Sequence, residues 1–340
     1  MVAPVSGITV IVPCRNEVAC ISHLLDDLAA QRLDESLTVV IADGMSEDGT
    51  WELLQGRLSA TSDPYRLILV QNPDRTIPHG LNRAVEAASD SVIIRLDAHG
   101  RVPTGYLSSI ATAIGARRDL LVGARIEMIP GNISRMASTI ALVLNSPIGS
   151  GGTASRGNLS APRSVAHTVM SCWHRDVWIA NGGFDESLLS NEDFDFDWRA
   201  GKRGCEVLSL SSPTYRLMAR PNLLALAQQR WRYGWWKAVV LRRYPRSLHL
   251  RQLVPPLALL VAVPIAILSP TTFAIFIGLW LIAVWTLSSR SARYTDHNAI
   301  DILARSPFAA AVIQFVWATG LIAGLVCNWP GPERRSASYP

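Results

Sequence analysis

The stretch ITVIVPCRNE at positions 8–17 joins a short β-branched run to a polar loop. The run Ile8–Val12 has the composition and length of a buried strand. The apolar residues that follow have the spacing of one helix face: Val18, Ile21, Leu24, Leu25 and Leu28. The start of the chain therefore predicts a strand, a polar loop and a helix, in that order.

The same alternation continues along the first part of the chain. Further strands are expected at Leu37–Ala42, Arg66–Val70 and Ser91–Leu96, with helices between them near 51–58 and 81–88. Such alternation predicts an α/β fold, Rossmann-like, with a mostly parallel sheet and helices on both of its faces. Ligands of open sheets bind beyond the carboxyl ends of the strands, so the loops that follow these strands are the candidate sites.

The composition excludes a disordered chain and argues against a purely soluble one. Of the 340 residues, 49% are hydrophobic and only 17% are charged, which is too apolar for disorder and unusually apolar for a soluble protein. The net charge is +5, but nearly all basic residues are Arg and none forms a stripe on a predicted soluble helix, so no nucleic acid is expected as a partner.

The five cysteines include no C-x-x-C pair, which argues against a disulfide framework or a zinc site. Residues 1–7 do not resemble a signal peptide.

The apolar excess lies in the C-terminal third. The stretch Leu253–Leu287 is about 35 residues long and almost uncharged, whereas one helix crosses a bilayer in about 20, so a hairpin that breaks near Ser269-Pro270 is predicted. A third apolar run, Pro307–Cys327, also has the length of a span. A buried helix pair in a soluble protein is the alternative, which the uniform apolarity disfavours.

Arginines flank the predicted hairpin on both sides: Arg242, Arg243, Arg246 and Arg251 before it, and Arg290, Arg293 and Arg305 after it. Positive charge marks the cytoplasmic side of a membrane protein. We therefore expect a multi-pass protein of the inner (cytoplasmic) membrane with a cytoplasmic N-terminal domain. A third span would place the tail outside, although Arg334 and Arg335 count against that, and a re-entrant element would change the number of spans.

Polar residues follow the second and fourth predicted strands. Asp43 begins an Asp-Gly turn, where a carboxylate can accept hydrogen bonds from a base or a ribose. Asp97 and His99 are two residues apart in an extended segment, so their side chains point the same way and can meet one divalent ion. Mixed oxygen and nitrogen ligation tolerates Mn²⁺ better than Mg²⁺. Each feature alone is also compatible with a structural role, since Asp-Gly turns are common and Asp97 could cap a helix.

The motifs together resemble the family 2 glycosyltransferases, which have a GT-A fold. The resemblance rests on Ile11–Glu17, the loop Asp43–Thr50, the acidic strand end at Asp97, and Asn191-Glu192-Asp193 after Gly182–Glu186. The triplet Asp97-Ala-His99, where most members have D-x-D, and Arg232–Lys237 ahead of apolar helices are similar to the membrane-bound glucosyltransferases of succinoglycan-type exopolysaccharide assembly.

The resemblance implies roles for these residues. The expected contacts to the nucleotide sugar are Pro13, Arg15, Glu17, Asp43, Arg75 and Asp97, with Arg83 as an alternative phosphate contact. Asp97 and His99 would hold a divalent cation, Mn²⁺ or Mg²⁺, that stabilises the leaving diphosphate. Because His99 replaces a carboxylate, the choice of metal and the need for one stay open.

Two neighbouring acids are the catalytic candidates. Asp193 is the expected general base that takes a proton from the acceptor hydroxyl, and Glu192 is the adjacent candidate. A helix that starts here would place Asp193 and Asp197 on one face. The alternative for Glu192 and Asp195 is that they are first-turn acids favoured by the helix dipole.

The segment Gln229–Tyr233 resembles the Q-x-x-R-W motif of processive polysaccharide synthases. Gln229, Arg232 and Tyr233 are therefore the expected contacts to the acceptor or its diphosphate. The same segment is typical of an amphipathic interfacial helix, and the two interpretations are compatible. Further acceptor or phosphate candidates are Thr153, Arg156 and His174.

The predicted function is membrane-anchored, inverting transfer of a sugar from a nucleotide sugar, UDP-linked, to a polyprenyl-diphosphate-linked glycan, with polysaccharide-assembly proteins as candidate partners. A polyprenyl-phosphate sugar synthase is one alternative. A non-catalytic membrane scaffold that binds nucleotide sugars is another, against which the presence of Asp43, Asp97 and Asp193 together argues. The expected domains are the transferase domain at 1–220, interfacial helices at 221–252, transmembrane helices at 253–328 in about three spans, and a tail at 329–340.

Overall fold

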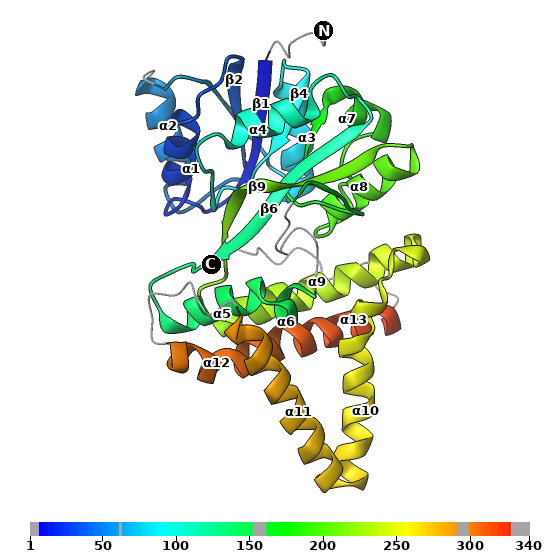
Figure 1. Cartoon of the computed structure of the whole chain (residues 1–340). Coiled ribbons are helices and arrows are strands. Elements are labelled where there is room, and N and C mark those ends of the chain that lie inside the picture. Colours follow the sequence, from blue (N-terminus) through cyan, green and yellow to red (C-terminus); the bar gives the residue numbers. More distant parts are fainter. Residues whose placement is uncertain (1–6, 61–62, 152–160, 291–298, 328–340) are drawn as a thin grey trace. The chain divides into compact units, whose positions relative to one another are not determined.

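The computed structural model describes residues 7–60, 63–151, 161–290 and 299–327 (Figure 1). Its strands are β1 (Gly7–Cys14), β2 (Ser36–Asp43), β3 (Arg66–Gln71), β4 (Val92–Arg95), β5 (Gly100–Arg101), β6 (Leu120–Ile129), β7 (Arg163–Ser164), β8 (Cys172–His174) and β9 (Glu206–Met218). Its helices are α1 (Ile21–Ala29), α2 (Thr50–Ala60), α3 (Ile77–Ala87), α4 (Tyr106–Ile114), α5 (Arg135–Asn145), α6 (Pro147–Ser150), α7 (Arg175–Asn181), α8 (Glu192–Lys202), α9 (Leu223–Arg243), α10 (Val254–Leu268), α11 (Pro270–Ser289), α12 (Ala299–Ala311) and α13 (Trp317–Val326). A π turn at Val312–Val316 joins α12 to α13, and 3₁₀ turns lie at Pro245–Ser247 and Leu250–Gln252.

The strands form a mixed sheet in the order β3-β2-β1-β4-β8-β6-β9-β5, with β7 paired to β9. The four strands expected from the sequence are confirmed as β1 to β4, and they pair in parallel. β8 continues the sheet antiparallel to β4, and β5 and β7 are antiparallel to β9. The expected α/β fold is therefore confirmed, and its parallel part carries the strand ends that the sequence singles out.

Two apolar cores lie on opposite faces of the sheet because successive residues of a strand point to opposite sides. Val10 of β1 belongs to the core that contains Leu24 of α1 and Tyr106 of α4. Its neighbour Ile11 belongs to the other core, with Leu81 of α3. Burial of both faces explains why the first strand does not alternate between apolar and polar residues; its one polar side chain, Thr9, is buried and donates its hydroxyl to Asp90 at 2.7 Å.

The chain divides into two compact units whose segments interleave in the sequence. Among the described residues, the first unit contains 7–127 and 161–217, and the second contains 128–151 and 218–327. The carboxyl ends of β1 to β4 and the whole of α8 therefore belong to the first unit. The second unit contains α5 and α6 in addition to the C-terminal helices.

The second unit contains the predicted hairpin, formed by α10 and α11 (Figure 1). Its break at Ser269, between Leu268 and Pro270, is where the sequence places it. Within the described residues, three helical segments are long and apolar enough to cross a membrane: Leu250–Leu268, Pro270–Ser289 and Ile300–Val326. The third includes the predicted run Pro307–Cys327 except its last residue and begins earlier.

Candidate active site

The loops after β1 and β2 are joined by hydrogen bonds between backbone and side chains. Asn16 donates its backbone N–H to the Ser46 hydroxyl at 2.8 Å and accepts the N–H of Glu47 on its side-chain oxygen at 2.8 Å. Asn16 has a left-handed backbone, with φ of 56°, and so does Met45, with φ of 58°. Left-handed residues other than glycine are strained and gather at functional sites, so this pair of loops is a candidate binding edge.

Asp43 ends β2 with its carboxylate buried against its own turn. One oxygen accepts the Ser46 hydroxyl at 2.5 Å, and the other accepts the Ser46 backbone N–H at 3.0 Å. Asp43 is only 2% exposed. The carboxylate is thus oriented by its turn, and its predicted contact to a base would use the remaining acceptor capacity of the two oxygens.

Glu17 and His99, which the sequence assigns to neighbouring roles, lie in contact. The Nδ1 of His99 is 3.1 Å from a Glu17 carboxylate oxygen. Glu17 is itself fixed, because its backbone N–H donates to the Thr50 hydroxyl at 2.9 Å. The loops after β1, β2 and β4 therefore meet at one place.

Arg95, at the end of β4, connects two of the predicted acids. Its Nη2 lies 2.9 Å from a Glu192 carboxylate oxygen and 3.5 Å from an oxygen of Asp97. Arg95 and Glu192 are each 4% exposed. The first turn of α8 and the end of β4 thus converge on one buried guanidinium. None of the sequence motifs points to Arg95. A charged residue inside the apolar run VIIRL, two residues before an acid, is nevertheless a signal of such a buried pair.

Glu192 titrates in an unusual range for a carboxyl group. Burial raises its pKa to about 7, although the guanidinium of Arg95 opposes that rise, and the charge of Asp193 adds to it. A carboxyl group with a pKa near neutrality, next to further acids, is typical of a catalytic centre. The ion pair with Arg95 shows that the helix dipole is not the sole interaction that stabilises Glu192 at the start of α8.

Asp193 is part of a short polar chain that the sequence does not predict. His167 places Nε2 3.7 Å from an Asp193 oxygen and Nδ1 2.8 Å from an Asp197 oxygen. One imidazole therefore contacts both Asp193 and Asp197, which the sequence predicts to share one face of α8. Burial lowers the pKa of His167, but the charges of Asp193 and Asp197 outweigh burial and leave that pKa raised.

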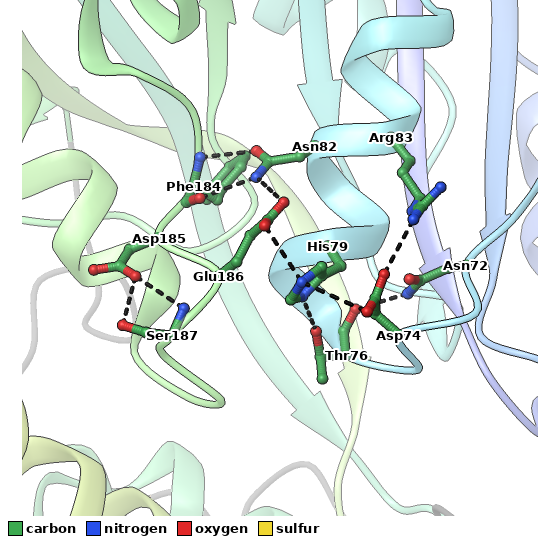
Figure 2. Close-up of polar contacts among 10 residues, drawn as sticks. All are labelled: Asn72, Asp74, Thr76, His79, Asn82, Arg83, Phe184, Asp185, Glu186 and Ser187. Carbon is green, nitrogen blue, oxygen red and sulfur yellow. Dashed lines mark hydrogen bonds and ion pairs between the residues drawn. The ribbon is translucent and has the colours of Figure 1, made fainter. Parts of the chain in front are cut away.

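Figure 2 shows how Asn82 of α3 holds the loop that precedes α8. Its side-chain amide donates to the Phe184 carbonyl at 3.0 Å and to a Glu186 oxygen at 2.9 Å, while its oxygen accepts the Phe184 N–H at 2.8 Å. Gly183 has φ of 75°, and a Cβ there would lie 2.9 Å from the Asn82 oxygen. The GGFDE segment is thus clamped to α3, and the ring of Phe184 stacks on Phe196 of α8 with centroids 4.5 Å apart.

Two arginines that the sequence assigns to phosphate contacts pair with acids. Arg83 donates to an Asp74 oxygen at 3.0 Å, and Arg75, with φ of 59°, lies 3.6 Å from an oxygen of Glu47. His79, on the same helix as Arg83, approaches Glu186 at 3.3 Å (Figure 2). Arg75 and Glu47 are exposed, so this contact would exchange readily for a phosphate.

The remaining sequence-predicted residues lie in two places. Pro13 is half-buried near the end of β1, and Arg15 is half-buried in the loop that follows, where its stem packs 3.2 Å from the position of a Cβ on Gly44. Gln229 donates to the Tyr233 hydroxyl at 3.3 Å, and Arg232 lies on the same helix, α9. These three residues belong to the second unit.

The structure corrects one candidate. His174 pairs with Val92, at the amino end of β4 and away from Asp97, and its Nε2 is bonded to the Gly115 carbonyl at 2.9 Å. It is 4% exposed. His174 is therefore a core residue, not an acceptor contact. Other candidates lie outside the described residues: Thr153, Arg156, Arg293, Arg334 and Arg335.

Asp97 and His99 are the candidate ligands of a divalent cation. In the part of the chain that the structure describes, no group of three or more His, Cys, Asp or Glu side chains is arranged to hold a metal ion. Asp97, 21% exposed, and His99, 23% exposed, offer one oxygen and one nitrogen near the surface. The segment is not extended as the sequence predicts: the Gly100 N–H donates to the Asp97 carbonyl at 3.0 Å, so Asp97 and His99 lie in a turn. Such a pair would suit an ion that takes its other ligands from a substrate diphosphate and water.

Two family models match the chain. Glycosyl transferase family 2 matches residues 9–173, and Glycosyl transferase family group 2 matches residues 92–288, which is more than half of the chain. The chain is 29% identical over 320 residues to the succinoglycan biosynthesis protein ExoA of Rhizobium meliloti (strain 1021), and the alignment covers 92% of each protein.

Solved structures share the fold at low sequence identity. The mannosyltransferase PcManGT from Pyrobaculum calidifontis, in complex with GDP-Man and Mn²⁺, has a TM-score of 0.61 at 17% identity, covering 95% of this chain and 89% of that one. Staphylococcus aureus TarS 1–349, in complex with UDP-GlcNAc, has a TM-score of 0.50 at 16% identity, covering 93% and 91%. The expected GT-A fold is confirmed. Since a family model also covers more than half of its length, the chain belongs to the family 2 glycosyltransferases.

Proposed function

We propose that the chain is a membrane-anchored, inverting enzyme that moves a sugar from a nucleotide sugar, UDP-linked, to a polyprenyl-diphosphate-linked glycan in exopolysaccharide or cell-envelope assembly. The observation that carries the proposal is the pairing of buried Arg95 with both Asp97 and Glu192, which brings the donor-side strand end to the acidic start of α8. The similarity to a succinoglycan biosynthesis protein supports the polysaccharide product. The apolar hairpin supports membrane anchoring.

In this reaction Asp193 takes the proton of the acceptor hydroxyl. The hydroxyl oxygen forms a bond to the anomeric carbon while the bond from that carbon to the nucleotide diphosphate breaks, and the diphosphate leaves with the electron pair. Attack from the opposite side inverts the configuration. Asp193 suits this role better than Glu192, because its side chain is 22% exposed whereas that of Glu192 is 6% exposed and held by Arg95.

His167 and Arg95 position the two acids of α8. Asp197 accepts the backbone N–H of Thr168 at 3.0 Å as well as the contact from His167, so the imidazole is fixed from behind. The imidazole of His167 contacts both carboxylates and so fixes the position of Asp193 relative to Asp197. Arg95 holds Glu192 away from the acceptor and keeps the charge of Asp97 next to the leaving diphosphate.

The donor would lie over the loops after β1, β2 and β4. Asp43 would meet the base, and Arg15, Glu17 and Arg75 would line the nucleotide sugar, with Pro13 shaping the pocket. Asp97 and His99 would hold a divalent cation, and the complex of PcManGT with GDP-Man and Mn²⁺ supports the use of such a cation. When bound, the ion supplies positive charge that stabilises the departing diphosphate.

The acceptor would approach from the lipid. Gln229, Arg232 and Tyr233 lie along one stretch of α9, which carries the amide, cation and phenol that a lipid-linked diphosphate and its sugar can bind. The aromatic residues of the same helix suit a membrane interface.

The test is sugar transfer in membranes that contain the wild type, Asp193→Asn or Asp176→Asn. Asp176 is an exposed acid at the start of α7 and serves as the matched control. Asp193→Asn should lower transfer from the competent nucleotide sugar by about 10²–10⁴-fold, the usual contribution of a general base. Transfer at the wild-type rate by Asp193→Asn would remove the assigned base.

The labelled lipid product separates the proposed acceptor from polyprenyl phosphate. A product that carries several sugars on a diphosphate agrees with the proposal, whereas an alkali-stable, acid-labile lipid that carries one sugar identifies a polyprenyl-phosphate sugar synthase. Nucleotide-sugar binding without transfer in every acceptor preparation would favour a scaffold.

A further inference from the structure

The third apolar segment, Ile300–Val326, is packed differently from the hairpin. In its most apolar window 39% of the residues are buried, against 6% for Leu250–Leu268 and 11% for Pro270–Ser289. The hairpin therefore presents most of its surface outward, as lipid-facing helices do. Ile300–Val326 is instead packed along part of its surface against other helices of the second unit.

Its principal neighbour is α9, and glycines bring the two backbones into contact. A Cβ on Gly320 of α13 would overlap the Trp231 carbonyl, and a Cβ on Gly324 would lie 2.9 Å from the Trp235 carbonyl. On α9, a Cβ on Gly234 would overlap the Trp317 carbonyl. Contact this close means that α13 and α9 take the same environment together.

That environment is not the hydrocarbon core, because α9 is a polar helix. Five cationic side chains lie along it: Arg230, Arg232, Lys237, Arg242 and Arg243. Cations are costly at the bilayer centre and belong at the interface. Arg242 also donates to the Gly324 carbonyl at 2.7 Å, which places a cation at the C-terminal end of α13.

Two further helices hold the same segment. Arg135 of α5 lies 3.3 Å from an Asp301 oxygen, and Gln314 donates to the Ile148 carbonyl of α6 at 3.2 Å. Only residues 130–134 separate β6 from α5, and only residues 219–222 separate β9 from α9. Even fully extended, such links reach about 20 Å, too short to cross a hydrocarbon core of about 30 Å.

Figure 1 shows the arrangement within the second unit: α9, α12 and α13 run across the base of the hairpin, and α10 and α11 project away from them. Large apolar side chains that remain exposed on α12 and α13 are Ile300, Phe308, Leu325 and Val326. A helix in the membrane plane buries such side chains at the boundary between headgroups and acyl chains.

We propose that the chain crosses the membrane only through α10 and α11, and that Ile300–Val326 lies in the plane of the cytoplasmic surface together with α9. This inference rests on the membrane anchoring in the proposed function. It places the end of α13 on the same side as the transferase domain. Length and composition alone allow three spans, and the packing selects two.

The experiment is cysteine labelling of the full chain in oriented membrane vesicles. The probe is a membrane-impermeant maleimide, and the sites are read peptide by peptide by mass spectrometry. Cys327, exposed at the end of α13, reports on which side of the membrane that helix ends. Cys20 of the transferase domain marks the cytoplasmic side, and Thr271→Cys, at the exposed tip of the hairpin, marks the other side.

Two crossings predict that Cys327 labels with Cys20 in inside-out vesicles and is at least tenfold less labelled in right-side-out ones. Labelling of Cys327 together with Thr271→Cys from the outside would overturn the proposal, because three crossings place both there. If Cys327 reacts from neither side, a reporter protein is fused to the C-terminus. A fluorescent protein that fluoresces there agrees with a cytoplasmic end of α13, whereas an active periplasmic phosphatase overturns the proposal. Labelling of all three sites from one side refutes membrane anchoring itself, which separates that failure from an incorrect number of crossings.

Discussion

Replacing Arg95 by methionine, an apolar side chain of similar length, should destabilise the transferase domain strongly. Arg95 is 4% exposed, and its Nη2 lies 2.9 Å from a Glu192 oxygen and 3.5 Å from an Asp97 oxygen. The substitution leaves the carboxylate of Glu192, also 4% exposed, without a cation. Removal of one partner from a buried ion pair costs about 3–5 kcal/mol because the other charge stays buried.

The two contacts contribute unequally. Asp97 is 21% exposed at a longer distance, so its contact with Arg95 adds about 0–1 kcal/mol. Glu192 accounts for most of the loss, but it can limit the loss by taking a proton, since its pKa is already about 7. We therefore expect about 3 kcal/mol for Arg95→Met at pH 8 and less at pH 5.5. For a domain of this size, that corresponds to a fall in Tm of roughly 6–12 °C.

The assay is thermal unfolding of the detergent-solubilised full chain as Arg95→Met, Glu192→Gln and the double variant, each at pH 5.5 and pH 8. The double variant should be more stable than Arg95→Met, because it no longer buries an unpaired carboxylate. The reasoning is refuted if Arg95→Met melts within about 2 °C of the wild type at pH 8, or if the losses of the single variants simply add.

Three further outcomes are expected. The folded-state pKa of Glu192 is raised to about 7, whereas the unfolded chain releases this proton above about pH 4.3. Between these two values the folded chain binds the extra proton, so Glu192 lowers the stability of the fold as pH rises from about 4.3 to about 7. The Tm of the wild type should therefore fall relative to the Tm of Glu192→Gln between pH 5 and pH 7.5. A constant difference between the two Tm values would contradict this. His167→Asn should lower kcat and leave the KM for the nucleotide sugar unchanged, because Asp193 loses the imidazole that positions it; an unchanged kcat would show that His167 does not position the base. Gly320→Ala should lower Tm, because its Cβ overlaps α9, while Gly278→Ala on α11, where a Cβ meets nothing within 4 Å, should not; equal Tm values would deny the close packing of α13.

The parts of the fold that the sequence predicts are those set by local periodicity. Buried parallel strands read as apolar runs, so β1 to β4 are predicted to within about three residues at each end. The hairpin break at Ser269-Pro270 follows from a proline that cannot continue the helix before it. The strands β8 and β9 have no such signal, because their positions depend on pairing with β4 and β5, which lie far away in the sequence.

The site divides in the same way. Asp97 and Asp193 are visible as acids at element ends, and family motifs assign them roles. Arg95 and His167 are not, because their importance comes from what they touch: Arg95 reaches Glu192 across 97 positions, and His167 joins α8 from the segment before β8. A single buried cation or imidazole has no periodicity, so only its partners distinguish a positioning residue from a core residue.

The number of membrane crossings shows why composition alone is insufficient. Hydropathy predicts a third span, and the Gly320-x-x-x-Gly324 spacing, which is common where membrane helices pack, would strengthen that prediction. The helix that contacts those glycines is the reason why we propose two spans. A helix can enter a bilayer only with what is packed against its backbone, and α13 is packed against a helix that carries five cations. Under the proposed two-span topology, the glycines that would favour a membrane-spanning pair instead hold α13 at the surface, because the environment of a helix depends on the helix it packs against as well as on its own sequence.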